Sequence, residues 1–244
     1  MEICGIRDVD RQKSKKCAKI AWEIADESMA IKSQVDTIKL AYIILAALII
    51  RILPILLGSP VASDVMYFHA QAIPVLNNQN IYKATHEVFP YSPLTMFIPA
   101  LCLLLSNKLN VPFCIIMKIP ALIGDISLTI AIYYWVMRYK NDRSAAFKAA
   151  MLYAVNPLAI LISAFQGNMM SLPTLFMFLA VMSISYDREK NYRLSALLLG
   201  LAIAFRGYPI LVLPLILLKA EISFSKKLKY LAYAVVPTVL LFMP

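Results

Sequence analysis

The chain has 244 residues, of which 61% are hydrophobic, and a formal net charge of +10. Its mean hydropathy of +0.71 excludes an ordinary soluble domain, in which only about half of the residues are apolar. The apolar residues come in continuous runs, several of them near the roughly 18 residues that a spanning helix requires. They do not alternate with polar residues as they would in a β-barrel. The sequence therefore predicts an all-α, polytopic transmembrane bundle, with about eight spans at the usual helix length.

The positive charge is concentrated in a few segments. Most of the 24 Lys and Arg residues lie in the tail and in short loops between apolar runs, at 1–39, 138–148, 188–193 and 219–229. Such clusters are typical of cytoplasmic segments, so the charge sets the membrane orientation and does not indicate nucleic-acid binding. We predict a multi-pass protein of a prokaryotic cell membrane with a cytoplasmic N-terminus.

The N-terminal part differs in composition from the rest. Residues 1–37 are polar and basic and carry no signal peptide, so they are predicted to be a cytosolic tail, either solvated or lying on an anionic leaflet. Residues 38–244 form the predicted transmembrane domain. The four cysteines have no close paired spacing, which predicts free thiols rather than a zinc site or a disulfide frame.

The first span is expected at about 39–57 and is followed by a long polar loop at 58–92, predicted to face outward. Arg51 lies inside this span, where an arginine is costly. It is expected either to snorkel toward the headgroups or to bind a substrate phosphate. A polar loop of this length between apolar spans is uncommon unless it is functional.

The remaining apolar runs alternate with basic loops on one side and short polar turns on the other. The alternation requires an odd number of crossings between residues 93 and 137, met by three short spans or by one span plus an in-plane helix. The later spans are expected at 147–165, 171–185, 194–205, 210–218 and from 226 to the end.

Polar residues that are candidates for catalysis or substrate binding gather at the predicted outer ends of the spans. Asp64 is placed to take a proton from an attacking hydroxyl, and Arg206 to hold a phosphate with its planar fork of donors. Each also has a structural interpretation, as a helix terminus, a cap or a headgroup anchor. The other candidates for substrate binding on this side are Tyr67, Tyr91, Gln166, Asn168 and Tyr208.

Lys118 and Asp125 are two ionisable residues within a long apolar stretch. On one continuous helix they would share a face about 10 Å apart. Ionisable residues at membrane depth suggest function, so both are candidates for substrate binding. A structural polar contact inside the bundle is the alternative.

Five motifs occur in an order that resembles the GT-C superfamily of membrane glycosyltransferases. The nearest likeness is to the GPI-type and archaeal mannosyltransferases that use polyprenyl-phosphate sugars. The motifs are Ser63-Asp64-Val65-Met66-Tyr67, Ile81-Tyr82 with Phe89-Pro90-Tyr91-Ser92-Pro93-Leu94, Gly124-Asp125, Asn156-Pro157-Leu158 with Gln166-Gly167-Asn168, and Arg206-Gly207-Tyr208-Pro209.

The resemblance implies transfer of a mannose-like hexose from a polyprenyl-phosphate donor to a glycan or lipid acceptor at the outer face. Asp64 matches the family's loop acid, and Arg206 matches the basic residue that contacts the donor phosphate. Two departures weaken a metal-dependent mechanism, because Met66 and Met170 stand where the mannosyltransferases have acids. A divalent metal is therefore left open, and no metal-binding residue is assigned.

The chain ends within an apolar run, whereas the relatives continue with further helices. This predicts a fragment, a split enzyme completed by a second polypeptide, or a degenerate copy. A non-catalytic subunit of the same fold is thus the main alternative to an enzyme. A small-solute transporter is a third hypothesis, which the small number of polar residues near the midplane disfavours.

Overall fold

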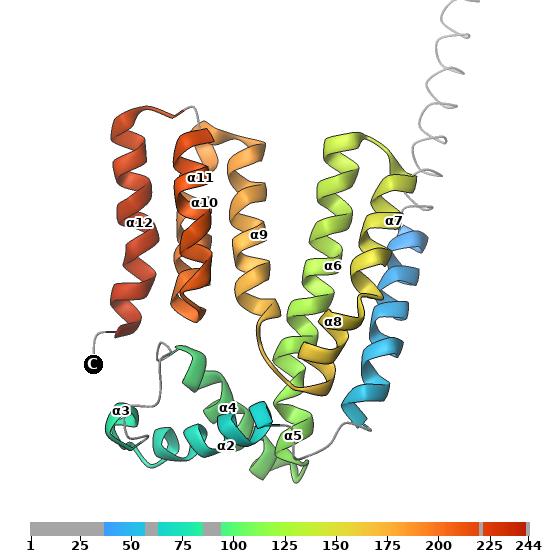
Figure 1. The fold of residues 1–244 in the computed structure, drawn as a ribbon, viewed down its shortest axis with the longest axis vertical. Helices are drawn as coiled ribbons and strands as arrows, with labels where there is room; N and C mark the ends of the chain where they lie inside the picture. The colour runs from blue at the N-terminus through green and yellow to red at the C-terminus, as the bar shows by residue number, and fades with distance from the viewer. Residues whose placement is uncertain (1–36, 57–62, 85–93, 220–221, 243–244) are drawn as a thin grey trace, which may run out of the picture. The chain divides into compact units, whose positions relative to one another are not determined.

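The computed structural model describes residues 37–56, 63–84, 94–219 and 222–242, and these are helices and short connections without strands (Figure 1). The prediction of an all-α membrane protein is confirmed. After a first helix at Thr37–Leu56, the elements are α2 (Ser63–Leu76), α3 (Ile81–Ala84), α4 (Leu94–Leu109), α5 (Phe113–Ile116), α6 (Lys118–Lys140), α7 (Arg143–Ala154), α8 (Pro157–Ile160), the π-helix η1 (Leu161–Phe165), α9 (Ser171–Tyr186), α10 (Arg188–Phe205), the 3₁₀-helix η2 (Tyr208–Leu211), α11 (Val212–Lys219) and α12 (Phe224–Phe242). The packing described below lies within one compact unit that begins at Ile43.

Two helical segments of the described chain are long and apolar enough to cross a membrane, Thr37–Leu56 and Phe113–Lys140. A third crossing results if the bent pair Arg143–Ala154 and Pro157–Phe165, which meet at 43°, is one broken span. This count is below the predicted number of about eight, which assumed one span for each apolar run. Several of the other runs form apolar helices of 10–17 residues, and α10 begins with charged residues.

Part of the predicted outer loop is helical. Within 58–92, the residues of α2 form a helix that packs against α4. Val65, Phe68 and Ala72 of α2 are buried, and they recur at the three- and four-residue spacing of a helix face. Because of this apolar stripe, the segment packs as a helix. Its many polar residues had indicated a loop.

Helix α6 packs on both α7 and α9. At the contact with α9 the helices approach closely, because Gly124 has no side chain. A Cβ at that position would lie 2.6 Å from Ser171 Oγ and 3.1 Å from the backbone nitrogen of Leu172. In turn, the Ser171 hydroxyl donates to the carbonyl of Ala121 at 2.8 Å. This contact holds the start of α9 against the N-terminal third of α6.

Helices α9, α10 and α12 form a second close-packed group. Small residues line the contact, and a Cβ on Gly200 would lie 2.4 Å from the carbonyl oxygen of Ala234. The Ser195 hydroxyl lies 2.7 Å from the carbonyl oxygen of Ala180 and 3.0 Å from the Tyr230 hydroxyl. Three helices therefore meet around a buried polar contact as well as an apolar core.

The basic loops lie at one end of these helices. In Figure 1 the turn between α6 and α7, the turn between α9 and α10, the end of α11 and the start of α12 are all at the top. Asp142 caps α7, and Asp187 caps α10 by accepting from Glu189 and Lys190 backbone nitrogens at 3.1 and 3.0 Å. Capping aspartates also suit the positive ends of the helix dipoles.

Candidate functional site

Two buried charged residues form an ion pair between the first helix and α6. The Nε atom of Arg51 lies 2.8 Å from Oδ2 of Asp125, and the two side chains are 0% and 2% exposed. Arg51 also donates from Nη1 to the carbonyl of Ala154 at 2.7 Å. The side chain therefore neither snorkels outward nor lies open for a phosphate, because its charge is directed into the bundle.

Two further groups complete the surroundings of Asp125. The Tyr153 hydroxyl donates to Oδ1 at 2.9 Å, and the Ser163 hydroxyl to Oδ2 at 2.5 Å. The carboxylate thus joins the first helix, α6, α7 and η1. Hydrogen bonds to both oxygens make it possible to bury a charged pair, whose desolvation is otherwise unfavourable. The arrangement favours the structural interpretation of Asp125.

Lys118 shares the α6 helix with Asp125 but does not pair with it. Its side chain is fully buried, and its one hydrogen bond among the described residues runs 3.5 Å to the carbonyl of Ile55. Within the described part of the chain, no carboxylate lies in ion-pair distance of this ammonium. In the segments that the structure describes, Lys118 is therefore a buried cation with weak compensation.

The polar turn Gln166-Gly167-Asn168 follows the π-helix and lies directly against Lys118. Gly167 has φ +73°, and a Cβ there would lie 3.0 Å from Val65 Cγ2 and 3.3 Å from Lys118 Cγ. Its left-handed conformation ends the helix, a use for which glycine is suited. The glycine thus allows the turn to contact both α2 and the stem of Lys118.

Asp64 and Asn168, which are 104 residues apart in the chain, are in direct contact. Nδ2 of Asn168 donates to Oδ2 of Asp64 at 2.9 Å. The Oδ1 atom of Asn168 is buried and has no hydrogen-bond partner in the described part of the chain. Two residues singled out from separate motifs therefore meet, and an acceptor is left for a donor that this part of the chain does not supply.

The Arg206-Gly207-Tyr208 motif follows the end of α10. Arg206 is the C-cap residue of that helix and is half-buried. The hydroxyls of Tyr208 and Thr174 are 2.7 Å apart, which connects this motif to α9. In addition, the Thr95 hydroxyl donates to the carbonyl of Phe205 at 2.8 Å and connects the end of α10, directly before the motif, to α4.

The other predicted residues occupy varied positions. Tyr67 is half-buried beside Phe68, with ring centroids 5.9 Å apart. Gln166 is half-buried in its turn, and Tyr91 lies outside the described residues. Met66 is 57% exposed. Sequence reasoning missed Tyr153, Ser163 and Thr174, which are ordinary residues in apolar helices and gain their roles only through their distant partners.

The chain matches the sequence profile of the family described as GPI transamidase subunit PIG-U over residues 32–243. The chain belongs to the PIG-U family. No curated protein and no solved structure matches it. The match covers the helices that carry the Arg51–Asp125 and Asp64–Asn168 contacts.

Membership in the PIG-U family corrects the functional prediction. The family is described as a transamidase subunit, so the prediction of a glycosyltransferase using a polyprenyl-phosphate sugar is wrong, and the mannosyltransferase resemblance was too specific. The broader prediction of a GT-C-like membrane protein is confirmed, and the non-catalytic subunit is the better supported alternative. The family match does not support a sugar-lipid donor as a partner of this chain. It supports the predicted association with a membrane and with a second polypeptide. The membrane orientation and the kind of membrane stay predictions.

Proposed function

We propose that this chain is a non-catalytic membrane subunit of a complex that transfers proteins to GPI anchors. The observation that carries the proposal is the match to the family described as GPI transamidase subunit PIG-U, which extends over residues 32–243. In this role the chain binds partner subunits and helps to hold the lipid-linked substrate in the membrane. The peptide-bond chemistry belongs to another polypeptide.

The contacts of the two membrane-associated carboxylates are consistent with this role. Both oxygens of Asp125 accept hydrogen bonds, and one of them is also paired with Arg51. Asp64 accepts a hydrogen bond from the Asn168 amide. A general base must be within hydrogen-bond reach of the proton that it removes. Asp125 is enclosed by its partners, and we assign Asp64 a positioning role for the turn that carries Asn168.

We further propose that the polar turn and Lys118 contact the headgroup of the lipid-linked substrate. A buried ammonium without a carboxylate partner among the described residues suits an anionic group, and the orphaned Oδ1 of Asn168 suits a hydroxyl or amine donor. Arg206, Tyr208, Gln166, Tyr67 and Tyr91 are retained as candidates for the same surface. A GPI anchor offers both phosphate and hydroxyl groups to such a surface.

The test is to remove the gene from its host and to analyse both surface proteins and lipids. Loss of a transamidase subunit should abolish display of a GPI-anchored reporter while the completed anchor lipid accumulates. Loss of a hexosyltransferase should instead accumulate an anchor precursor that lacks the hexose. Re-expression of the full chain should restore the reporter. Accumulation of the hexose-deficient precursor would overturn the proposal.

A further inference from the structure

A second site lies at the basic end of the helices, distinct from the polar turn. A cleft of about 540 Å³ is lined by Trp135, Arg138 and Tyr139 of α6, Ser185 and Tyr186 of α9, and Lys219 of α11. This volume lies within the roughly 300–1,000 Å³ of small-molecule pockets. The lining combines two cations with three aromatic rings, and aromatic residues gather where a bilayer meets water.

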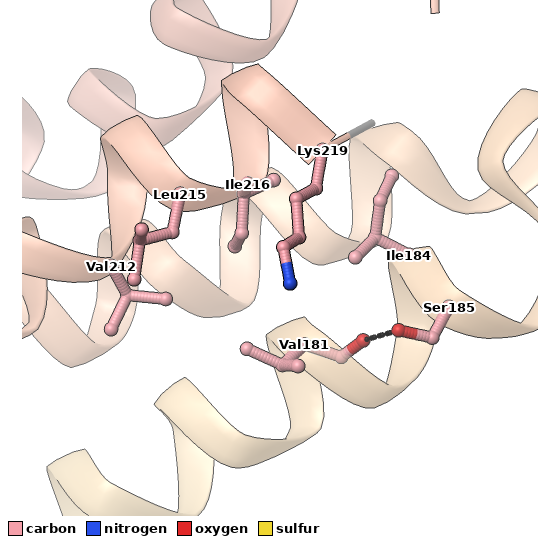
Figure 2. A pocket seen from close by; sticks show the side chains of 7 residues that line it. All are labelled: Val181, Ile184, Ser185, Val212, Leu215, Ile216 and Lys219. Atoms are coloured by element: carbon pink, nitrogen blue, oxygen red, sulfur yellow. Dashed lines mark hydrogen bonds between the residues drawn. The ribbon is translucent and has the colours of Figure 1, made fainter. Parts of the chain in front are cut away.

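An apolar groove continues from this cleft between α9 and α11. It has a volume of about 280 Å³ and shares Ser185 and Lys219 with the cleft. The other lining side chains are aliphatic, namely Val181, Ile184, Val212, Leu215 and Ile216. Figure 2 shows the Lys219 side chain extending from α11 toward α9, with its nitrogen above the groove. A charged and aromatic mouth thus opens directly into an aliphatic channel.

The cations of the mouth are not neutralised by the described acidic residues around them. The guanidinium of Arg138 lies over the Tyr186 ring, 4.6 Å from its centroid. Stacking on the ring face leaves the N–H donors at the guanidinium edge available for an anion. Among the described residues, no carboxylate lies within ion-pair distance of Arg138 or Lys219.

The acidic residues at this end of the described chain are engaged elsewhere. Asp142 accepts from the backbone nitrogens of α7, and Asp187 from those of α10. Glu189 forms an ion pair with Lys226. Among the described residues, the charge balance around the cleft therefore favours an external anion at its mouth.

We propose that this cleft and groove bind one anionic phospholipid of the surrounding bilayer. Its phosphate lies between Arg138 and Lys219, the glycerol region faces the aromatic residues, and one acyl chain occupies the groove between α9 and α11. Charge complementarity selects the headgroup, and the aliphatic continuation distinguishes a lipid from a soluble phosphate. This site is separate from the substrate role proposed above, because Arg138 lies near the end of α6, 20 residues away from Lys118, and Lys219 lies at the end of α11.

Trp135 supplies a probe within the cleft itself. The full chain with Trp22→Phe retains Trp135 as its single tryptophan and is reconstituted into phosphatidylcholine vesicles. Bromine atoms on lipid acyl chains quench nearby tryptophan fluorescence. At equal mole fraction, brominated phosphatidylserine should quench Trp135 at least about threefold more effectively than brominated phosphatidylcholine, because basic residues near a membrane surface attract anionic lipids.

Charge variants separate this cleft from a generally positive surface. Arg138→Gln with Lys219→Gln should abolish the preference for phosphatidylserine. Lys140→Gln with Lys190→Gln removes the same charge from exposed positions outside the cleft and should preserve it. Equal quenching by both lipids, or equal loss in both double variants, would overturn the proposal.

A second readout addresses the groove and its occupant. Native mass spectrometry of the detergent-purified chain should detect one retained anionic phospholipid, which Leu215→Phe should displace while the protein keeps its melting temperature. The same quenching measurement on the assembled complex should give the same preference. If assembly removes the quenching, a partner helix occupies the groove and the lipid proposal is wrong. This result is independent of the anchor-lipid analysis, so the two proposals fail separately.

Discussion

The guanidinium of Arg51 and the carboxylate of Asp125 are joined at 2.8 Å across 74 residues of sequence, in a part of the bundle where both are almost completely buried. The pair connects the first helix to α6, and Tyr153 and Ser163 extend the connection to α7 and η1. Buried pairs of this kind join helices that pack together. Their net contribution to stability is small until one partner is removed.

Removing only one member of the pair should therefore lower the stability of the protein strongly. Arg51→Met leaves the Asp125 charge without its cation, and we expect a loss of about 3–5 kcal/mol in stability. Asp125→Leu combined with Arg51→Met should recover most of that loss, because neither charge remains buried. Thermal unfolding of the wild type, the two single variants and the double variant in one detergent gives the coupling energy. Additive effects of the two substitutions would show that the pair is not coupled.

Asp64→Asn separates a positioning role from a catalytic one. The amide oxygen of an asparagine can still accept from Nδ2 of Asn168, so display of the GPI-anchored reporter should stay within about twofold of wild type if the hydrogen bond is retained. A catalytic base replaced in this way would lose about 10²–10⁴-fold in rate. Asp64→Leu, which removes the acceptor, should lower both reporter display and melting temperature. A complete loss with Asp64→Asn in a normally folded protein would contradict the positioning role.

Gly167→Ala should destabilise the turn against Lys118. The position requires φ +73°, and the added Cβ would approach Val65 and Lys118. An alanine in the left-handed region costs roughly 1–2 kcal/mol before any contact is counted. Gly207→Ala is the matched control, because a Cβ there meets no atom within 4 Å. The melting temperature should fall for the first variant only, and an equal response would refute the role assigned to Gly167.

Gly200→Ala should disturb the contact between α10 and α12 more than Gly124→Ala disturbs that between α6 and α9. At Gly200 the nearest atom is a backbone oxygen at 2.4 Å, which can move only with its helix. At Gly124 the nearest atom is the Ser171 hydroxyl at 2.6 Å, and Ser171→Ala removes it. Overpacking typically costs about 1–3 kcal/mol. Thermal unfolding should therefore show partial rescue of Gly124→Ala by Ser171→Ala. No side-chain truncation on α12 should rescue Gly200→Ala, and a rescue by Pro237→Ala would argue against a backbone clash.

The sequence determined the class of protein, since continuous apolar runs can be buried only in a bilayer or in a large core. It also locates the motifs, and Asp64 and Asn168, which belong to two of them, are in direct contact in the structure. It overstated the chemistry, because a resemblance in motif order reports common descent of a fold and not whether a carboxylate is free to react. The sequence also allows a non-catalytic subunit, and the family match supports this alternative over a glycosyltransferase.

Only the tertiary structure decided the partners of the buried charges. From spacing, Lys118 and Asp125 share a face of α6, but Asp125 binds Arg51 because the first helix brings a planar donor group to it. Helical periodicity fixes the direction of a side chain within its own helix. The choice of partner depends on which helices pack together, and that is set by close contacts such as Gly124 against Ser171 and Gly200 against Ala234, between residues tens of positions apart.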